Sequence, residues 1–152
     1  MIRRLSSVFF LSVVSCSDNA TTDGSDSCQI VDLPLTGGSN APVVTDVALE
    51  PQSGEGIVVL ATAADPQGSE NLRGVPQIIR VFQDARCETS PIVLEDDLAA
   101  SGVEESFGIA VPATNQALFN AIAAAESWPV EVDFRDIDEN STSARVLAII
   151  LR

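Results

Sequence analysis

A six-residue stretch near the C-terminus constrains the fold of this chain more than any other segment. In Val130 to Arg135 (VEVDFR), Val130, Val132 and Phe134 alternate with charged residues. An alternation with a period of two is typical of a β-strand that buries one face and exposes the other. The polar residues 136–143 (DIDENSTS) follow, and then the apolar run 144–151 (ARVLAIIL). This arrangement predicts two strands joined by a polar loop.

Further stretches predict strands at residues 42–50, 56–64, 77–83, 91–94 and 103–111. In the first of them, Val43, Thr45, Val47 and Leu49 fall on one side, although Val44 interrupts the alternation. The second, GIVVLATAA, is rich in small and β-branched residues, which favours a strand buried on both faces. The sequence DPQG then supplies the residues of a turn.

A short helix is predicted directly before the late hairpin. Residues 115–126 are rich in alanine and place Leu118, Ile122 and Ala125 on one face, which is typical of an amphipathic helix of about three turns. Thr114 is placed to cap its first turn. The large aromatic residues of this region are expected to pack in the core rather than to bind a ligand; they are Phe119 and Trp128.

Short strands separated by turn signals, in a domain of about 110 residues, predict a two-sheet β-sandwich. The late hairpin, VEVDFRDIDENSTSARVLAII, resembles the final strand pair of immunoglobulin-like domains in bacterial surface proteins. In those domains a D-x-[DN]-x-N-x-[ST] loop commonly joins the last two strands, and the turn at residues 64–68 resembles their loop after the second strand. The resemblance covers most of the chain after Asn40. It implies an all-β, immunoglobulin-like two-sheet sandwich of about seven strands with one short helix before the last hairpin. The Cys-Trp-Cys core of antibody domains is missing, because Cys28 precedes the first strand and Trp128 comes late.

The N-terminus has the layout of a secretory signal. Arg3 and Arg4 precede an apolar run, residues 5–14, which a small residue and Cys16 close. About ten apolar residues are too few to cross a bilayer, which needs about 20. The ending Val-Val-Ser-Cys resembles the lipobox of bacterial lipoproteins, which implies that residues 1–15 are removed and that Cys16 carries a lipid anchor with chains such as palmitate. In that family, Ser17 after the cysteine favours sorting to the outer membrane rather than the inner one.

The expected organisation follows from this signal. Residues 1–15 form the signal peptide, 16–38 a lipidated cysteine with a flexible acidic tether, and 39–152 the immunoglobulin-like domain, although ordered sequence already begins near Cys28. Once the lipid takes Cys16, Cys28 and Cys87 remain as an even pair in an oxidising compartment. A disulfide would close a loop of about 60 residues and stabilise the domain by about 4 kcal/mol. Two free buried thiols are the alternative.

Composition narrows the possible chemistry. Beyond Cys16 the chain has six arginines and 22 acidic residues, a net charge of −16, and it contains no histidine, lysine or tyrosine. The charge argues against nucleic acid and anionic lipid surfaces as partners. The missing residue types exclude Ser-His-Asp and Cys-His arrangements, Schiff-base chemistry and a Walker lysine. Paired carboxylates of the glycosidase type would find little room in a small β domain. We therefore expect a protein that is not an enzyme.

Acidic and amide side chains are predicted to gather at one end of the sandwich. There the loop after the second strand, the loop between the last two strands and the approach to the first strand would meet. Calcium prefers six to eight oxygen ligands on such loops, whereas ordinary turns also favour Asp, Asn and Ser. The candidate calcium ligands are Asn40, Asp65, Glu70, Asp136, Asp138 and Asn140, with Glu139 nearby.

The sequence thus leads to a function stated as a class. We expect a lipid-anchored, non-catalytic module of the bacterial cell envelope that makes protein–protein or adhesive contacts with an envelope protein not yet identified. The alternative is an envelope protein that binds calcium or carbohydrate through the acidic loops. Sugar binding usually recruits exposed aromatic rings, and this chain has few aromatic residues.

Overall fold

The computed structural model describes residues 28–52, 56–97, 105–111 and 115–152. The predicted signal peptide, Cys16, the tether up to residue 27 and Thr114 lie outside these ranges. The predicted strands are present, and β1 is added to them. The elements are β1 Leu35–Thr36, β2 Val43–Gln52, β3 Gly56–Ala64, η1 Ser69–Leu72, β4 Pro76–Val81, β5 Ile92–Asp97, β6 Glu105–Val111, α1 Gln116–Ala124, β7 Ser127–Arg135 and β8 Ser141–Ile150.

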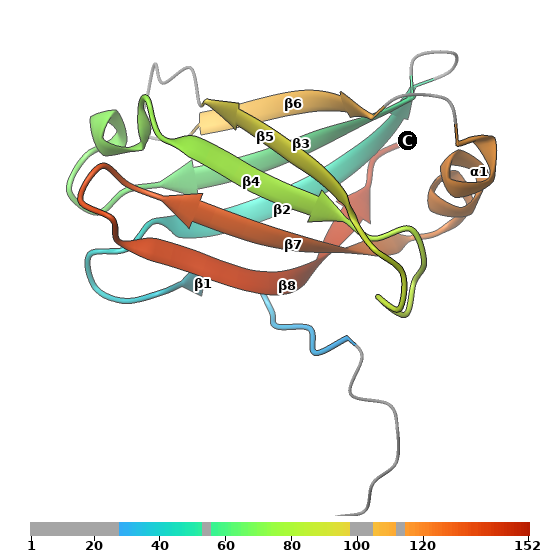
Figure 1. Ribbon diagram of the computed structural model, residues 1–152, viewed down its shortest axis with the longest axis horizontal. Coiled ribbons are helices and arrows are strands. Elements are labelled where there is room, and N and C mark those ends of the chain that lie inside the picture. Colours follow the sequence, from blue (N-terminus) through green and yellow to red (C-terminus); the bar gives the residue numbers. More distant parts are fainter. Residues whose placement is uncertain (1–27, 53–55, 98–104, 112–114) are drawn as a thin grey trace, which may run out of the picture.

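The strands form an all-β sandwich, as the sequence predicted. They follow one hydrogen-bonded path in the order β5-β4-β7-β8-β2-β3-β6, and β1 pairs with β2. Every neighbouring pair is antiparallel except β2 and β8, which run parallel and are matched only at Ala48↔Ile149 and Leu49↔Ile150. Figure 1 shows β4, β7 and β8 in front of β2 and β3. The short parallel contact therefore joins a front layer (β5, β4, β7, β8) to a back layer (β2, β3, β6).

Both layers contribute to one hydrophobic core. Val130, Val132 and Phe134 of β7 are fully buried, and they belong to the same cluster as Val59 and Ala61 of β3. The period-two pattern of β7 is confirmed. Burial of each of these larger side chains contributes about 1.5–3 kcal/mol to folding, so the inward face of β7 is a major source of the free energy that holds the two layers together.

β2 departs from the simple alternation expected for it. The pairing of β2 with β3 shifts register between Val44 and Asp46, where the strand bulges. An extra residue in one strand reverses the side to which the following side chains point. Val44, Val47 and Leu49 are therefore buried while Thr45 is exposed. The prediction that Thr45 shares the side of Val47 was wrong, and the bulge explains why Val44 interrupted the pattern.

Helix α1 lies at one end of the sandwich (Figure 1) and links β6 of the back layer to β7 of the front layer. Its buried residues are Leu118 and Ile122, as predicted. The capping residue differs from the prediction. The Oδ1 atom of Asn115 accepts a hydrogen bond of 3.1 Å from the Leu118 amide, so the helix begins one residue later than a Thr114 cap would place it.

Part of the segment expected to be a tether belongs to the folded domain. Cys28 forms a disulfide with Cys87, which confirms the predicted pair. The Val31 amide donates a hydrogen bond of 2.9 Å to the Arg145 carbonyl, and Leu35 in β1 is partly buried against the core. Contacts with the rest of the fold therefore extend back to Cys28, ahead of residue 39. The two-residue strand β1 leaves too short a pattern to recognise in the sequence. Among the residues described, no helix has the length and apolar character needed to span a bilayer.

Candidate functional site

The acidic loops meet at the end of the sandwich opposite α1 (Figure 1). The Ile137 amide, in the β7–β8 turn, donates a hydrogen bond of 2.9 Å to the Asn71 carbonyl in η1, which follows β3. At the start of β8, Thr142 donates its hydroxyl to the Pro42 carbonyl and accepts a 2.7 Å hydrogen bond from the Gly37 amide. The three loops are thus held together by one backbone hydrogen bond and by two hydrogen bonds of the Thr142 hydroxyl.

Asp136 uses its carboxylate to build the β7–β8 turn. Its side chain is 2% exposed. Oδ1 accepts hydrogen bonds from the amides of Asp138 (2.9 Å) and Asn140 (2.8 Å), and Oδ2 accepts one of 2.8 Å from the Asn140 side chain. Glu139 occupies a left-handed conformation with φ 66°. The geometry gives Asp136 a structural role in which both oxygens already have donors within the turn.

Asp65 stabilises the turn after β3 in a similar way, but only one of its two carboxylate oxygens accepts hydrogen bonds from the described residues. Its Oδ1 accepts a 2.7 Å hydrogen bond from the Gln67 amide and a long one of 3.5 Å from the Asn71 side chain. The residue is 8% exposed, and within the described residues its buried Oδ2 has no hydrogen-bond partner. A buried carboxylate oxygen without a donor carries a desolvation cost, so among the described loop residues this is the buried oxygen left open to a ligand.

The remaining candidate ligands lie on the surface. Asn40, Glu70 and Asp138 are exposed, and Asn140 is partly buried through its contact with Asp136. In the described part of the chain, no three cysteine, aspartate or glutamate side chains stand close enough to hold a metal ion together. A hollow of about 570 Å³ beside the turn is lined by Val75, Arg135, Asp136, Glu139 and Ser141. The described side chains thus do not form a multi-carboxylate calcium cage.

A second candidate surface covers the outward side of the front layer. We call it the front face and define it by outward side chains of β4, β7 and β8: Arg80, Glu131, Asp133, Arg135, Arg145, Leu147 and Ile149. These positions alternate with the buried residues of the same strands. The front face carries three of the six arginines that follow Cys16.

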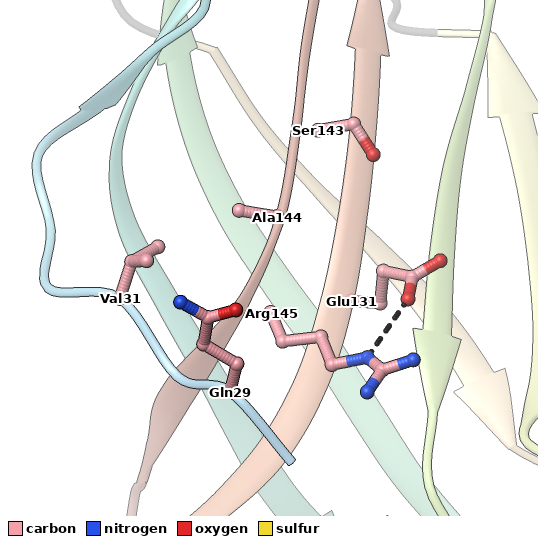
Figure 2. Close-up of a pocket in the computed structure, with 6 residues that line it drawn as sticks. All are labelled: Gln29, Val31, Glu131, Ser143, Ala144 and Arg145. Carbon is pink, nitrogen blue, oxygen red and sulfur yellow. Dashed lines mark hydrogen bonds and ion pairs between the residues drawn. The ribbon is translucent and has the colours of Figure 1, made fainter. Parts of the chain in front are cut away.

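The N-terminal segment borders the front face along β8. Figure 2 shows Gln29 and Val31 of this segment across from Glu131 and Arg145. Together with Ser143 and Ala144, these residues line an open groove of about 440 Å³. The Arg145 guanidinium lies 5.2 Å from the centroid of the Phe82 ring, and this cation–π contact helps to hold the arginine in place.

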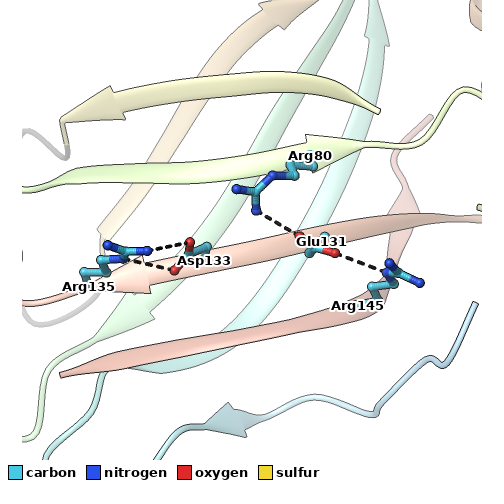
Figure 3. Close-up of polar contacts among 5 residues, drawn as sticks. All are labelled: Arg80, Glu131, Asp133, Arg135 and Arg145. Carbon is cyan, nitrogen blue, oxygen red and sulfur yellow. Dashed lines mark hydrogen bonds and ion pairs between the residues drawn. The ribbon is translucent and has the colours of Figure 1, made fainter. Parts of the chain in front are cut away.

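Charged side chains of the front face are paired across the strands (Figure 3). Glu131 accepts from Arg80 on one side (2.9 Å) and from Arg145 on the other (3.1 Å). These residues lie opposite one another in the register of β4, β7 and β8. Such partly exposed pairs contribute about 0–1 kcal/mol each. Their main effect is to fix the orientation of three long side chains.

Asp133 and Arg135 form a second pair, two residues apart on β7. The guanidinium donates to both carboxylate oxygens, at 3.3 and 3.1 Å. The hydrogen bonds from Arg135 to Asp133, and then the attraction between their charges, raise the pKa of Arg135 above its usual range. The Arg135 guanidinium therefore stays charged at any physiological pH.

Aliphatic side chains continue the front face toward the end of β8. Leu147 is 47% exposed and Ile149 is 49% exposed. They are two residues apart on one strand, so they point to the same side of the sheet. The strip lies next to Arg145 in the sequence and places an apolar surface beside the paired charges.

Sequence reasoning missed the buried hydrogen bonds of two residues, Gln77 and Trp128. Gln77 is fully buried, and its amide donates to the carbonyls of Val75 and Arg135 and accepts from the Arg135 amide. It replaces the backbone pairing that β4 no longer makes with β7 at this end. A signal was present, because Gln77 occupies the inward position two residues before Ile79. Trp128 packs in the core as expected and also donates to the Phe82 carbonyl at 2.8 Å.

The sequence matches no known family model, and comparisons with curated proteins and with solved structures found no significant similarity.

Proposed function

We propose that this protein is a lipid-anchored, non-catalytic, immunoglobulin-like module of the bacterial cell envelope that binds a partner protein through its front face. The observation that carries the proposal is the combination of paired charges and an exposed aliphatic strip on one flat surface. Protein interfaces commonly join an apolar centre to a polar rim that includes arginine.

The arrangement of strands supports an immunoglobulin-like module. Immunoglobulin-type sandwiches place their third, sixth and seventh strands in one sheet and their second and fifth strands in the other. When the strands are counted from β2, the third, sixth and seventh are β4, β7 and β8, which share the front layer. The second and fifth are β3 and β6, which are neighbours in the back layer. The helix between β6 and β7 occupies the connection from the back sheet to the front sheet.

The charge distribution favours a protein partner on the front face. Arg80, Arg135 and Arg145 lie there beside Glu131 and Asp133. The exposed Glu95 of the neighbouring strand β5 points to the same side, because Ile78 pairs with both Glu95 and Asp133. The rest of the chain is strongly acidic, and like charges across an interface disfavour association. The front face is therefore the part of the surface on which another acidic envelope protein meets the least repulsion.

The anchoring proposal rests on Cys16 and on its distance from the fold. Twelve chain steps separate Cys16 from Cys28, the first described residue, and a random coil of this length spans about 20 Å. Such a tether would keep the domain within reach of the membrane surface. Mass spectrometry of the protein extracted from host envelopes tests this proposal: parent protein carries a lipid on Cys16, whereas Cys16→Ser is released into the soluble fraction. Recovery of an unmodified Cys16 from the envelope overturns it.

A pair of charge-introducing variants tests the front face. Leu147→Glu and Ile149→Glu are expected to fold, because both side chains are half exposed, and to remove a photo-crosslink formed in host cells by a photoreactive residue at position 143. Ile137→Glu is the matched control, since Ile137 is 56% exposed on the loop at the end of the sandwich. If Ile137→Glu loses the crosslink while the two strand variants keep it, the front face is not the interface and the partner binds the loops instead.

A second candidate, calcium binding, is supported by one observation, the buried Oδ2 of Asp65 that lacks a donor. The melting temperature of the chain is measured in EDTA and in millimolar calcium, because a ligand specific for the folded state raises stability with its concentration. Asp65→Asn retains the shape and the Oδ1 acceptor but removes the charge, so it is expected to abolish a calcium-dependent rise. Equal melting temperatures in both solutions contradict this candidate.

A further inference from the structure

The N-terminal segment is joined to the domain by one covalent link and few non-covalent ones. Val31 makes one backbone hydrogen bond to Arg145, and the Thr142 side chain bonds to the Gly37 amide and the Pro42 carbonyl. Leu33 and Leu35 are partly buried against the core. β1 contributes two register positions with β2. Backbone pairs at a strand end separate one after another when the end is pulled away, so these contacts alone would resist little tension. The Cys28–Cys87 disulfide lies before all of them in the chain.

The loop that receives this disulfide is braced by a single carboxylate. Asp84 accepts hydrogen bonds from the amides of Arg86 (2.8 Å), Glu88 (3.2 Å) and Thr89 (2.8 Å) and from the Thr89 hydroxyl. Cys87 itself is held in a left-handed conformation with φ 58°, and its amide donates to the Asp84 carbonyl. The pKa of Asp84 falls to about 2, chiefly through the Thr89 hydroxyl, so the brace remains charged in mild acid.

The braced loop is also tied to the core of the front layer. Gln83 donates to the Ser90 carbonyl across the base of the loop at 2.7 Å. The Trp128 ring, which is buried in the core, donates to the Phe82 carbonyl. β4 enters the loop directly and pairs with β5 on one side and β7 on the other. A force applied to Cys87 is therefore spread over three paired strands.

We infer that the Cys28–Cys87 disulfide is the point at which tension from the N-terminal tether enters the fold. The segment 29–42, which contains β1, is then shielded from that tension. This role goes beyond the proposed function and rests on it, because tension arises only when the protein is anchored at one end and bound to a partner. With the disulfide intact, the path of the force runs from Cys28 to the Asp84-braced loop and on into β4. Without it, the same force peels the N-terminal segment from β8 and β2.

Single-molecule pulling tests this assignment. One handle is attached at Ser17 of the chain 17–152, which keeps every described contact, and the other at an azide-bearing residue in place of Leu147. The oxidised protein is expected to show no extension before the domain ruptures. Cys28→Ser/Cys87→Ser, and the parent protein in reductant, are expected to lengthen first at lower force. The gain is at most about 50 Å, the fully extended length of residues 28–42 before β2.

Two further variants separate the path of the force from a general loss of stability. Val31→Pro removes the hydrogen bond to Arg145; it is expected to leave the oxidised trace unchanged and to lower the force of the early extension in the double serine variant. Asp84→Ala is expected to lower the force of the first rupture in the oxidised protein. In the double serine variant, it is expected to leave the force of the early extension unchanged. Identical first events with and without the disulfide overturn the inference. The pulling result is independent of lipid on Cys16 and of any partner, so failure of the proposed function is read separately.

Discussion

The carboxylate of Asp136 accepts three hydrogen bonds from its own turn, and it does so almost completely buried. Asp136→Ala leaves two amides and one side-chain donor without an acceptor. Since hydrogen bonds to a charged group contribute more than neutral ones, the substitution is expected to lower the free energy of unfolding by about 3 kcal/mol. Urea denaturation measures the change. Asp138→Ala, at an exposed position of the same turn, is the control and is expected to stay within about 0.5 kcal/mol of the parent.

Asp84 is the residue whose ionisation is most perturbed in the described chain. Its pKa is lowered from 3.8 to about 2, chiefly by the Thr89 hydroxyl, while desolvation is the next-largest cause and raises it, and three backbone amides lower it further. A folded-state pKa below the unfolded value means that the stabilisation is present above pH 3.8 and is lost as the pH falls through about 2. Thr89→Val removes the largest cause, so an NMR titration is expected to show the Asp84 midpoint rising toward 3.8. An unchanged midpoint would show that the hydroxyl does not determine this pKa.

The candidate site could be predicted from single residues only in part. The sequence identified Asp65 and Asp136 as acids of loops at one end of the sandwich, and the structure places their loops in contact. It could not tell that the Asp136 oxygens are occupied by the turn itself, because ligand and turn-forming roles use the same residue types. The pairing of Arg80, Glu131 and Arg145 depended on strand register. Register is set by contacts between distant segments, which no local pattern contains.

At the scale of elements, prediction succeeded where a pattern was long. β3 has the predicted bounds, and β7 contains the predicted alternation. β1 spans two residues and was missed, because a period of two needs at least four residues to be recognised. The β2 bulge left a trace in the sequence at Val44, yet the pairing with β3 was needed to interpret it.

The cap of α1 gives a prediction at this scale. Asn115 places its side-chain oxygen on the Leu118 amide and thereby satisfies one of the amides left open at a helix start. Asn115→Ala is expected to reduce the free energy of unfolding by about 1 kcal/mol, and Asn115→Asp to retain most of it. Chemical denaturation followed by Trp128 fluorescence measures both variants. Asn120→Ala, exposed in the same helix, controls for helix propensity; equal losses at positions 115 and 120 would contradict a capping role.

At the scale of the whole molecule, the two layers and the N-terminal segment are joined at few places. β2 and β8 share two register positions, one core runs between the layers, and the disulfide spans 59 residues of sequence. A single core of this kind predicts one cooperative unfolding transition. The disulfide restricts the unfolded chain far more than it adds contacts to the folded one.

Removal of the disulfide is therefore expected to weaken the molecule without dividing it. A closed loop of this length stabilises by about 4 kcal/mol on the loop-entropy account, so Cys28→Ser/Cys87→Ser should lower the free energy of unfolding in urea by that amount while keeping one transition. The slope of the transition should increase, because the uncrosslinked chain exposes more surface when it unfolds. The oxidised and reduced parent protein give the same comparison without substitution. Two separate transitions would show that the N-terminal segment and the layers fold independently. A loss well below 1 kcal/mol would mean that strain in the folded state offsets the restriction of the unfolded chain.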